Sequence, residues 1–336
     1  MSKPPRGFAG CREQYIDAIL QVAERIIDDA GLAASSIAAM LDYQMETGGK
    51  RIRAVLPLMV AEALGRDPAK MVAFGAACEL IHNATLVHDD LQDGDRLRRG
   101  QPAAWVQYGS ERAINLGDAL LYLAPLCLEE VDVDAGVRWA VTSQICRQVL
   151  RVIDGQQREF DLAVRSATPA DYRRMVSGKT SGLFALPMAG AARLLEAPQP
   201  VVDGLEEAAR HLGILFQIQD DILDLYGDKG RDAPGGDIRE GKVSALVVAF
   251  VDRAPDADVD RLVSILEADR EATAVDDVEW AIEEFRRSGA VDEAFDEIDD
   301  LAERARTVAS LEDYPELRSL IEELTRFIVE PIDDVR

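Results

Sequence analysis

The chain has 336 residues, of which 48% are hydrophobic, and it carries a formal net charge of −25 at pH 7. This length and composition allow a large buried core and leave room for one to three domains. The charge argues against binding to nucleic acid or to an anionic membrane surface, because either would repel the protein.

The N-terminus, MSKPPRGFAG, has no apolar core of signal-peptide length. The longest apolar run, from Ala119 to Leu128, is short and contains Pro125. We therefore expect a soluble, cytoplasmic protein without an integral membrane segment. The four cysteines form no CxxC pair, so we expect reduced thiols and no zinc site, with Cys11 as the exposed one.

Apolar residues recur at helical spacing along nearly the whole chain, for example in 16–26, 56–63 and 317–328. No window of alternating residues with hairpin-type turns stands out. Glycine and proline divide the pattern into roughly a dozen helices, and Thr168 followed by Pro169 is typical of a helix start. The sequence predicts an all-α fold, a bundle of long helices around a central cavity.

No linker of low complexity interrupts the pattern, so we predict a single domain over residues 1–336. Residues 255–336 hold 26 acidic and 9 basic residues, a net charge of −17. We expect these acidic C-terminal helices to pack on the outside of the domain. The 31 arginines and six lysines suit either a salt-adapted organism or a GC-rich genome.

Two acidic motifs each end an apolar helical segment. In HDDLQD, Asp89 and Asp93 are four residues apart, so their carboxylates share one helix face, a geometry suited to Mg²⁺. In QIQDDILD, Asp220 and Asp224 repeat this spacing. The chain has 36 aspartates, and chance would produce about 0.4 such matches, so a single one would be weak support. Two matches, each followed by a glycine-rich loop, favour metal binding over a solvated acidic face.

Basic residues stand where they could bind phosphate. GGKRIR opens a helix, so backbone N–H groups and the cations of Lys50 and Arg53 converge at a helix N-terminus. Further candidates are Arg98-Arg99, Lys179 and Lys242. For each of these groups alone, a charge at a helix end or a surface ion pair is at least as plausible.

Together these motifs resemble the trans-prenyltransferases, the isoprenyl diphosphate synthases, from about Ile16 to Ile328. The order carries the resemblance: GGKRIR, LIHNATLVHDDLQDGDRLRRGQP, INLGDALL, GQQREFDL, KTSGLF, FQIQDDILDLYGD and GGDIREGK. It implies a type I isoprenoid synthase fold, a homodimer, and three Mg²⁺ ions per active site, for which Mn²⁺ may substitute.

The resemblance also implies residue roles. The Mg²⁺ ligands would be Asp89, Asp93 and Asp220, with Asp90, Asp221 and Asp224 completing or orienting the shell. Isopentenyl diphosphate would be held by Lys50, Arg53, His82 and Arg99, and the allylic diphosphate by Arg98, Lys179 and Lys242. Thr180 and Gln217 would lie near the developing carbocation. For His82, a core histidine without a substrate role remains the alternative.

The implied reaction joins isopentenyl diphosphate to an allylic C5–C15 primer and yields an all-trans prenyl diphosphate. In this family a bulky aromatic residue at the position of Ala84 tends to stop growth at farnesyl. The small side chains of Ala84 and Thr85 therefore predict a product of C20 or longer.

Some positions depart from the family pattern. Ala233 stands where the family usually has a lysine, Ala54 where it has a proline, and the segment 244–246 lacks the usual proline. Two alternatives stay open: a class I terpene cyclase or squalene/phytoene synthase, and a non-catalytic partner of another synthase, which Ala233 favours. A cyclase would have no use for Lys50, Arg53 and Arg99, and a non-catalytic partner would not need two intact aspartate motifs.

Overall fold

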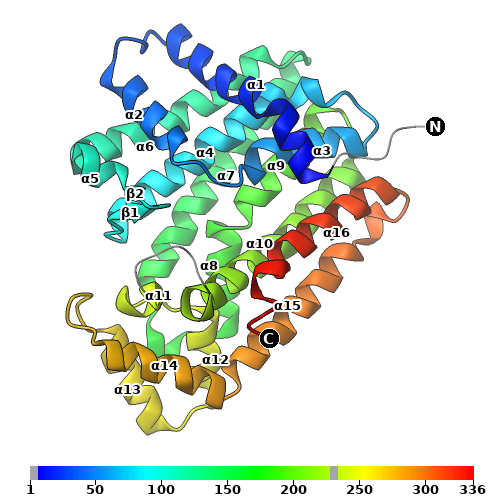
Figure 1. Cartoon of the computed structure of the whole chain (residues 1–336). Helices are drawn as coiled ribbons and strands as arrows, with labels where there is room; N and C mark the ends of the chain where they lie inside the picture. The colour runs from blue at the N-terminus through cyan, green and yellow to red at the C-terminus, as the bar shows by residue number, and fades with distance from the viewer. Residues whose placement is uncertain (1–6, 228–233) are drawn as a thin grey trace. The chain divides into compact units, whose positions relative to one another are not determined.

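The fold is almost entirely helical (Figure 1). The computed structural model describes residues 7–227 and 234–336. Within these ranges it has sixteen α-helices, five short 3-10 helices and one pair of two-residue strands. The predicted all-α class is confirmed, with somewhat more helices than the dozen expected. The departure at Ala233 lies outside the described residues.

Most of the elements in the described ranges follow one another after short connections. The N-terminal helices are α1 Phe8–Asp29, α2 Ser36–Glu46, α3 Ile52–Ala63, α4 Val72–Gln92, α5 Ala104–Tyr108, α6 Ser110–Leu126, α7 Ala135–Asp161 and α8 Pro169–Lys179. The C-terminal helices are α9 Gly182–Leu194, α10 Gln199–Tyr226, α11 Gly236–Arg239, α12 Ala245–Arg253, α13 Asp256–Leu266, α14 Val275–Arg287, α15 Ala290–Arg306 and α16 Pro315–Val329. The strands are β1 Leu97–Arg98 and β2 Gln101–Pro102, and the 3-10 helices are η1 Pro68–Met71, η2 Cys127–Glu130, η3 Val164–Ser166, η4 Ala309–Leu311 and η5 Glu330–Ile332.

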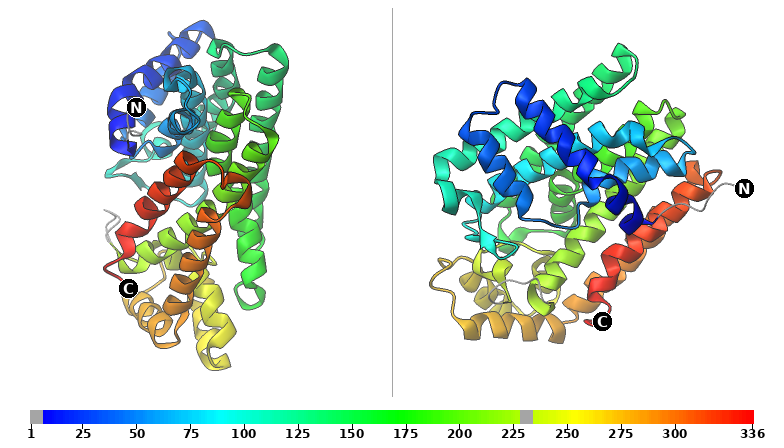
Figure 2. Two further views of the ribbon diagram at one scale, coloured as in Figure 1. Left: turned by 90° about the vertical axis from the view of Figure 1, so that its right-hand side faces the viewer. Right: turned by 45° about the horizontal axis from the view of Figure 1, so that its top comes forward.

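The chain forms two compact units. The first comprises residues up to Val149 with Leu183–Glu207 and Ala309–Leu320, and the second comprises Leu150–Gly182, Ala208–Val308 and Ile321–Arg336. Neither unit is a continuous segment. Helices α7 and α10, green and yellow-green in Figure 2, each contain residues of both units. The prediction of a single domain over residues 1–336 therefore stays a prediction.

In the first unit, α4 packs against α1, α3 and α6. Its apolar residues are buried, and small residues let the helices approach closely. A side chain at Gly75 would overlap the carbonyl oxygen of Ala54 on α3, and one at Gly117 on α6 would overlap the ring of His88. This packing holds the C-terminal end of α4, which carries the first aspartate motif, against its neighbours.

In the second unit, α12 packs against α8, α14 and α15. Phe250 of α12 lies edge-on to Phe285 of α14, with ring centroids 5.4 Å apart. The predicted helix start at Thr168 is confirmed, because its side chain and that of Asp171 cap each other's backbone N–H at the start of α8. The beginning of α8 is thus set by local sequence.

The strand pair is a feature that the sequence analysis missed. Leu97 pairs with Pro102 and Arg98 with Gln101 in antiparallel register. Arg99 and Gly100 form the turn with φ of 54° and 79°. Two positive φ values give the twist that a two-residue hairpin requires. The strands are too short for alternating apolar residues to be recognisable, so periodicity could not predict this hairpin.

The expectation for the cysteines was wrong in one respect. Cys11 is buried, and the exposed cysteine is Cys146. Cys11 lies on the same face of α1 as Ile19, Val22 and Ile26, so it belongs to the apolar side of an amphipathic helix. Cys146 lies on the outward face of α7.

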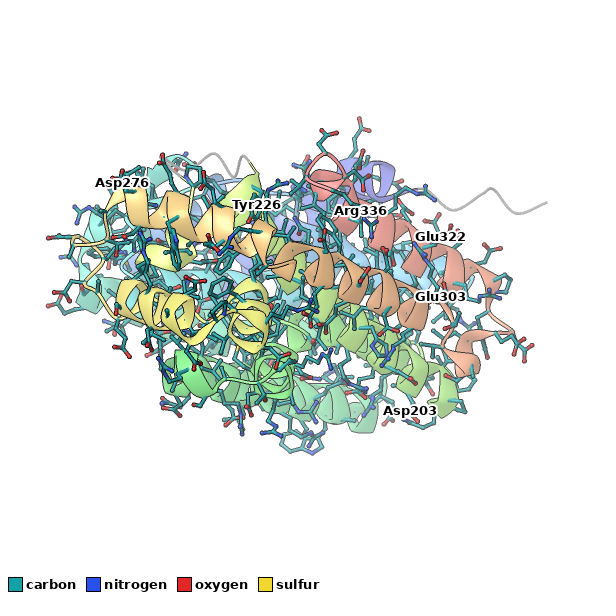
Figure 3. All side chains as sticks on the ribbon, turned by 90° about the horizontal axis from the view of Figure 1, so that it is seen from below. Asp203, Tyr226, Asp276, Glu303, Glu322 and Arg336 are labelled. Carbon is teal, nitrogen blue, oxygen red and sulfur yellow. The ribbon has the colours of Figure 1, made fainter. Side chains whose placement is uncertain are left out.

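Many acidic side chains of the C-terminal helices are exposed, among them Asp276, Glu303 and Glu322. Figure 3 shows these three side chains at the surface of α14, α15 and α16. Residues 255–336 have a net charge of −17, but their exposed charges are screened by water and salt, so the repulsion between them is weak. Within the described part of the chain, none of the helices is both apolar enough and long enough to cross a membrane.

Candidate functional site

The first aspartate motif ends helix α4. The helix finishes at Gln92, and the backbone N–H of Asp93 still donates to the carbonyl of Asp89 at 2.8 Å. Asp89 and Asp93 therefore keep helical spacing, one turn apart. A helix C-terminus carries partial negative charge, which favours a cation there. The motif thus adds two carboxylates to an end of α4 that already attracts cations.

Asp90 has a different environment from the carboxylates beside it. Its side chain is buried, and its Oδ1 accepts a hydrogen bond from Arg98 Nε at 2.7 Å. Burial raises the pKa of Asp90, while the Arg98 guanidinium opposes this rise. Asp90 Oδ2 is buried and has no hydrogen-bond partner among the described residues. Asp90 therefore orients Arg98 through Oδ1, while its Oδ2 makes no hydrogen bond to the described residues.

The hairpin that carries Arg98 and Arg99 is held from two sides. Tyr43 of α2 donates its hydroxyl to the carbonyl of Pro102 at 2.7 Å. Trp105 of α5 donates its indole N–H to the carbonyl of Asp95 at 2.8 Å. Both contacts fix backbone on either side of the turn. Arg98 and Arg99 are consequently held on a short segment whose backbone is fixed by these two hydrogen bonds.

The GGKRIR segment forms a loop with unusual backbone angles before α3. Gly48, Gly49 and Arg51 all have positive φ, of 77°, 116° and 57°. Positive φ costs energy for a residue other than glycine, so Arg51 must be held by its surroundings. Arg99 Nη1 donates to the carbonyl of Gly48. The hairpin and this loop are therefore joined through Arg99.

His82 and Arg53 form the inner part of the same region. Arg53 Nη1 lies 3.5 Å from His82 Nε2, and burial lowers the pKa of Arg53 to about 10. Burial also holds the pKa of His82 well below its usual value, so the ring is neutral at pH 7. Four guanidinium groups near the ring add to that effect, those of Arg53, Arg99, Arg98 and Arg51.

The His82 ring is hydrogen-bonded at only one of its two nitrogens. Its Nδ1 is buried and has no hydrogen-bond partner among the described residues. A buried polar atom without a partner is costly unless a ligand or water satisfies it. Arg51 and Arg98 pair with Glu79 and Asp90, so Arg53 and Arg99 supply the positive charge beside the ring and make this a cationic site suited to an anion. The substrate role of His82 stays a prediction, which the unsatisfied Nδ1 fits.

Gly49 offers a test of this loop, because an added Cβ would overlap the Arg99 guanidinium. We expect Gly49→Ala to displace Arg99 and to raise the Kd for inorganic pyrophosphate, used as an anionic probe, by about tenfold, about 1.4 kcal/mol of lost binding. Calorimetric titration checks this result. Gly48→Ala is the matched control, because it has the same kind of positive φ but nothing within 4 Å of an added Cβ. Equal effects of the two substitutions would contradict a role for Arg99.

The second aspartate motif lies in the last turns of α10, in the second unit, so it too sits near a helix C-terminus. Asp224 Oδ2 accepts the backbone N–H of Asp237 at 2.9 Å, which ties α10 to the start of α11. Asp220 and Asp224 keep the predicted one-turn spacing. The end of α10, like the end of α4, thus carries two carboxylates one helical turn apart.

Asp221 is buried and receives three hydrogen bonds. Tyr172 of α8 donates its hydroxyl at 2.7 Å, the backbone N–H of Ala245 donates at 2.7 Å, and Gln217 Nε2 donates at 3.0 Å. Burial nevertheless raises the pKa of Asp221 to about 6. Gln217 Oε1 in turn accepts from Thr180 Oγ1 at 2.8 Å. The structure thus brings Thr180 and Gln217 together, and Asp221 anchors them to α8, α10 and α12.

The remaining predicted cations of the second unit are ion-paired. Lys179 Nζ bonds to Glu159 on α7, and Lys242 Nζ lies 2.7 Å from Glu240. Glu240 also lies 3.2 Å from Arg270. In the first unit Lys50 is exposed. These pairs hold the lysines in defined positions within the second unit.

The number of carboxylates in each motif fits the way in which proteins usually bind Mg²⁺. Among the described residues, there is no group of three or more His, Cys, Asp or Glu side chains already arranged as a metal site. Mg²⁺ is usually bound through one or two carboxylates together with substrate phosphates and water, rather than by a complete protein cage. Asp89 and Asp93, in the same unit as the cationic site, match that requirement, and Asp220 and Asp224 form the same kind of pair in the second unit.

Comparisons with known proteins agree with these features. The polyprenyl synthetase family model matches residues 34–285. A short chain isoprenyl diphosphate synthase from Methanothermobacter thermautotrophicus is 36% identical over 260 residues, which cover 75% of this chain and 77% of that protein. The crystal structure of geranylgeranyl pyrophosphate synthetase from Pyrococcus horikoshii is similar with a TM-score of 0.83 and 29% identity, over 96% of this chain and 98% of that one.

A polyprenyl synthase from Caulobacter crescentus, whose structure contains calcium and isoprenyl diphosphate, is similar with a TM-score of 0.83 and 26% identity. The similarity covers 98% of this chain and 99% of that chain. The chain belongs to the polyprenyl synthetase family. The family resemblance, the helical fold class and the prenyltransferase class of enzyme predicted from the sequence are confirmed.

Several residues of the site were not predicted. Glu79, Asn83 and Tyr172 hold predicted residues or their loops in place, and Glu159 and Glu240 pair with the predicted lysines. Glu79 had a detectable signature, because it is a charged residue inside the otherwise apolar segment before HDDLQD. Glu240 lies within the quoted GGDIREGK motif, whereas Tyr172 had no such signature.

Proposed function

We propose that this chain condenses isopentenyl diphosphate with an allylic diphosphate to form an all-trans prenyl diphosphate of C20 or longer. The cationic site around His82 is the observation that carries the proposal. A terpene cyclase ionises one diphosphate and would not need it, whereas a condensing enzyme binds two. Conversely, the intact aspartate pairs argue against a non-catalytic partner, so neither alternative is favoured.

In this proposal each unit contributes its own residues. In the first unit Lys50, Arg53, His82 and Arg99 bind isopentenyl diphosphate. Arg98, Lys179 and Lys242 bind the allylic diphosphate, and the six aspartates of the two motifs bind or orient Mg²⁺. Three Mg²⁺ ions, for which Mn²⁺ can substitute, would neutralise charge on the allylic diphosphate as it leaves. Calcium in the Caulobacter crescentus structure supports divalent ions in this family.

The chain's own groups account for the remaining steps. Cations around the diphosphate lower the cost of breaking the allylic C–O bond. In this proposal the hydrogen-bonded pair Thr180 and Gln217 lies near the developing allylic cation, which the oxygen dipoles of the pair stabilise. The isopentenyl double bond then attacks that cation, and the departing diphosphate takes up the proton that is lost. A side-chain nucleophile is not needed.

Product length depends on helix α4 in this proposal. The growing chain runs along the face that carries Thr85, Ala84, Ile81 and Ala77, toward a central cavity. Ala84 and Ala77 are small, and both are buried together with Ile81 in the first unit. The similarity to a geranylgeranyl pyrophosphate synthetase supports a product of at least C20.

A homodimer is also part of the proposal. On α7 the apolar side chains of Trp139, Leu150, Ile153 and Phe160 are exposed, by 71%, 64%, 54% and 54%. With Cys146 they follow a heptad-like spacing along one face of this long helix. An exposed apolar stripe of this kind is typical of a surface that another subunit covers. A cytoplasmic location remains a prediction.

The test is incubation of the protein with Mg²⁺, labelled isopentenyl diphosphate and one of three allylic primers, of C5, C10 or C15. We expect incorporation of label into prenyl diphosphates, with C20 or longer as the main product. Chromatographic sizing of the hydrolysed products measures the length. Without isopentenyl diphosphate, a cyclase would still release a hydrocarbon or alcohol from the primer, and that result would contradict the proposal.

A further inference from the structure

A buried ion pair lies beneath the proposed isopentenyl diphosphate site. Arg51 Nη1 donates to Glu79 Oε1 at 2.6 Å, and the two side chains are only 5% and 3% exposed. Burying two charges is costly unless their geometry and hydrogen bonds compensate. Stability alone therefore does not explain a buried ion pair next to the loop that is proposed to bind substrate.

The contacts of Glu79 fix it firmly within α4. Its Oε1 also accepts from Asn83 Nδ2 at 3.0 Å, one turn along the helix. The Asn83 amide oxygen lies 3.4 Å from Gln44 Nε2 of α2. Glu79 is thus a rigid acceptor, held by the helix on which His82 also lies.

Arg51 links Glu79 to the loop that precedes α3. It has a positive φ of 57°, and its Nη2 donates to the carbonyl of Met45 at the end of α2. The guanidinium therefore ties both ends of the loop 45–51 to α4. Gly48, within this loop, accepts the hydrogen bond from Arg99. The position of Arg99 consequently depends on the pairing of Arg51 with Glu79.

We infer that Arg51 and Glu79 are positioning residues, which hold the loop 45–51 and Arg99 in place to receive isopentenyl diphosphate without contacting it themselves. Arg51 belongs to the basic GGKRIR motif, yet its charge is committed to Glu79. The inference rests on the proposed function. It assigns the pair a selective effect on one of the two substrates.

Two substitutions of Glu79 separate positioning from charge. Glu79→Gln and Glu79→Leu both remove the negative charge and have similar size, but only glutamine keeps an oxygen that accepts from Arg51. We expect Glu79→Leu to raise KM and the calorimetric Kd for isopentenyl diphosphate by about tenfold or more. We expect Glu79→Gln to stay within about threefold of the parent protein. KM for the allylic primer should change by less than about twofold in both.

Val60→Ala controls for loss of stability, because Val60 is fully buried on α3, about two turns beyond the first residue of that helix. It should lower Tm and leave both KM values unchanged. The inference is overturned if Glu79→Gln and Glu79→Leu shift KM equally, or if Glu79→Leu raises both KM values together. If Glu79→Leu does not fold, Arg51→Lys and Arg51→Met form the corresponding pair, and only methionine should raise KM for isopentenyl diphosphate. Inactivity of the parent protein would instead contradict the proposed function.

Discussion

Replacing Asp89 with alanine is expected to lower kcat by at least about a thousandfold, which corresponds to about 4 kcal/mol of transition-state stabilisation. The same holds for Asp220→Ala. Each substitution removes a carboxylate at a helix end that we propose to bind Mg²⁺ on the allylic diphosphate. Product formation at saturating Mg²⁺, measured with labelled isopentenyl diphosphate, checks the result. Near-normal turnover by either variant would contradict the assignment of the two motifs.

The Asp89→Ala substitution should not lower the Tm, although it lowers kcat. Asp89 lies near the negative end of the α4 dipole, where a carboxylate without a bound cation is unfavourable by about 0.3–1 kcal/mol. In metal-free buffer we therefore expect Asp89→Ala to have an equal or slightly higher Tm and an unchanged helical circular dichroism spectrum. Asp17→Ala is the control, because Asp17 is an exposed aspartate on α1 of the same unit. It should change neither activity nor fold.

Enlarging the side chain at Ala84 is expected to shorten the product. Ala84 is fully buried on α4, one turn before His88, on the face along which we propose that the prenyl chain grows. In the series Ala84→Val, Ala84→Leu and Ala84→Phe, the main product should become stepwise shorter and reach C15 with phenylalanine. Chromatography of the hydrolysed products measures this length.

Loss of stability would give a different outcome in the same series. Extra volume in a packed core typically costs about 1–3 kcal/mol, so the larger variants will also be less stable. A destabilised enzyme makes less product of the same length, whereas an obstructed path makes a shorter product. Unchanged length in a folded, active Ala84→Phe variant would show that the prenyl chain runs elsewhere.

Local patterns in the sequence determined much of what the structure contains. The 3.6-residue periodicity predicted the helices, Thr168 and Pro169 predicted the start of α8, and spacing alone placed Asp89 with Asp93 and Asp220 with Asp224 on common helix faces. These features depend on residues within one or two turns of each other. The order of the motifs then identified the family.

Tertiary structure decided which charges are available and which are neutralised. Arg51 belongs to the basic GGKRIR motif, but it pairs with Glu79, 28 residues away. Asp90 and Asp221 were expected to complete or orient the metal shell, and the structure adds their partners: Asp90 bonds Arg98, and Asp221 accepts from Tyr172, 49 residues before it. Such partners meet only when helices pack, and periodicity within a single helix carries no information about them. The sequence by itself therefore determined the helices, the motifs and the family, while packing decided the role of each buried charge.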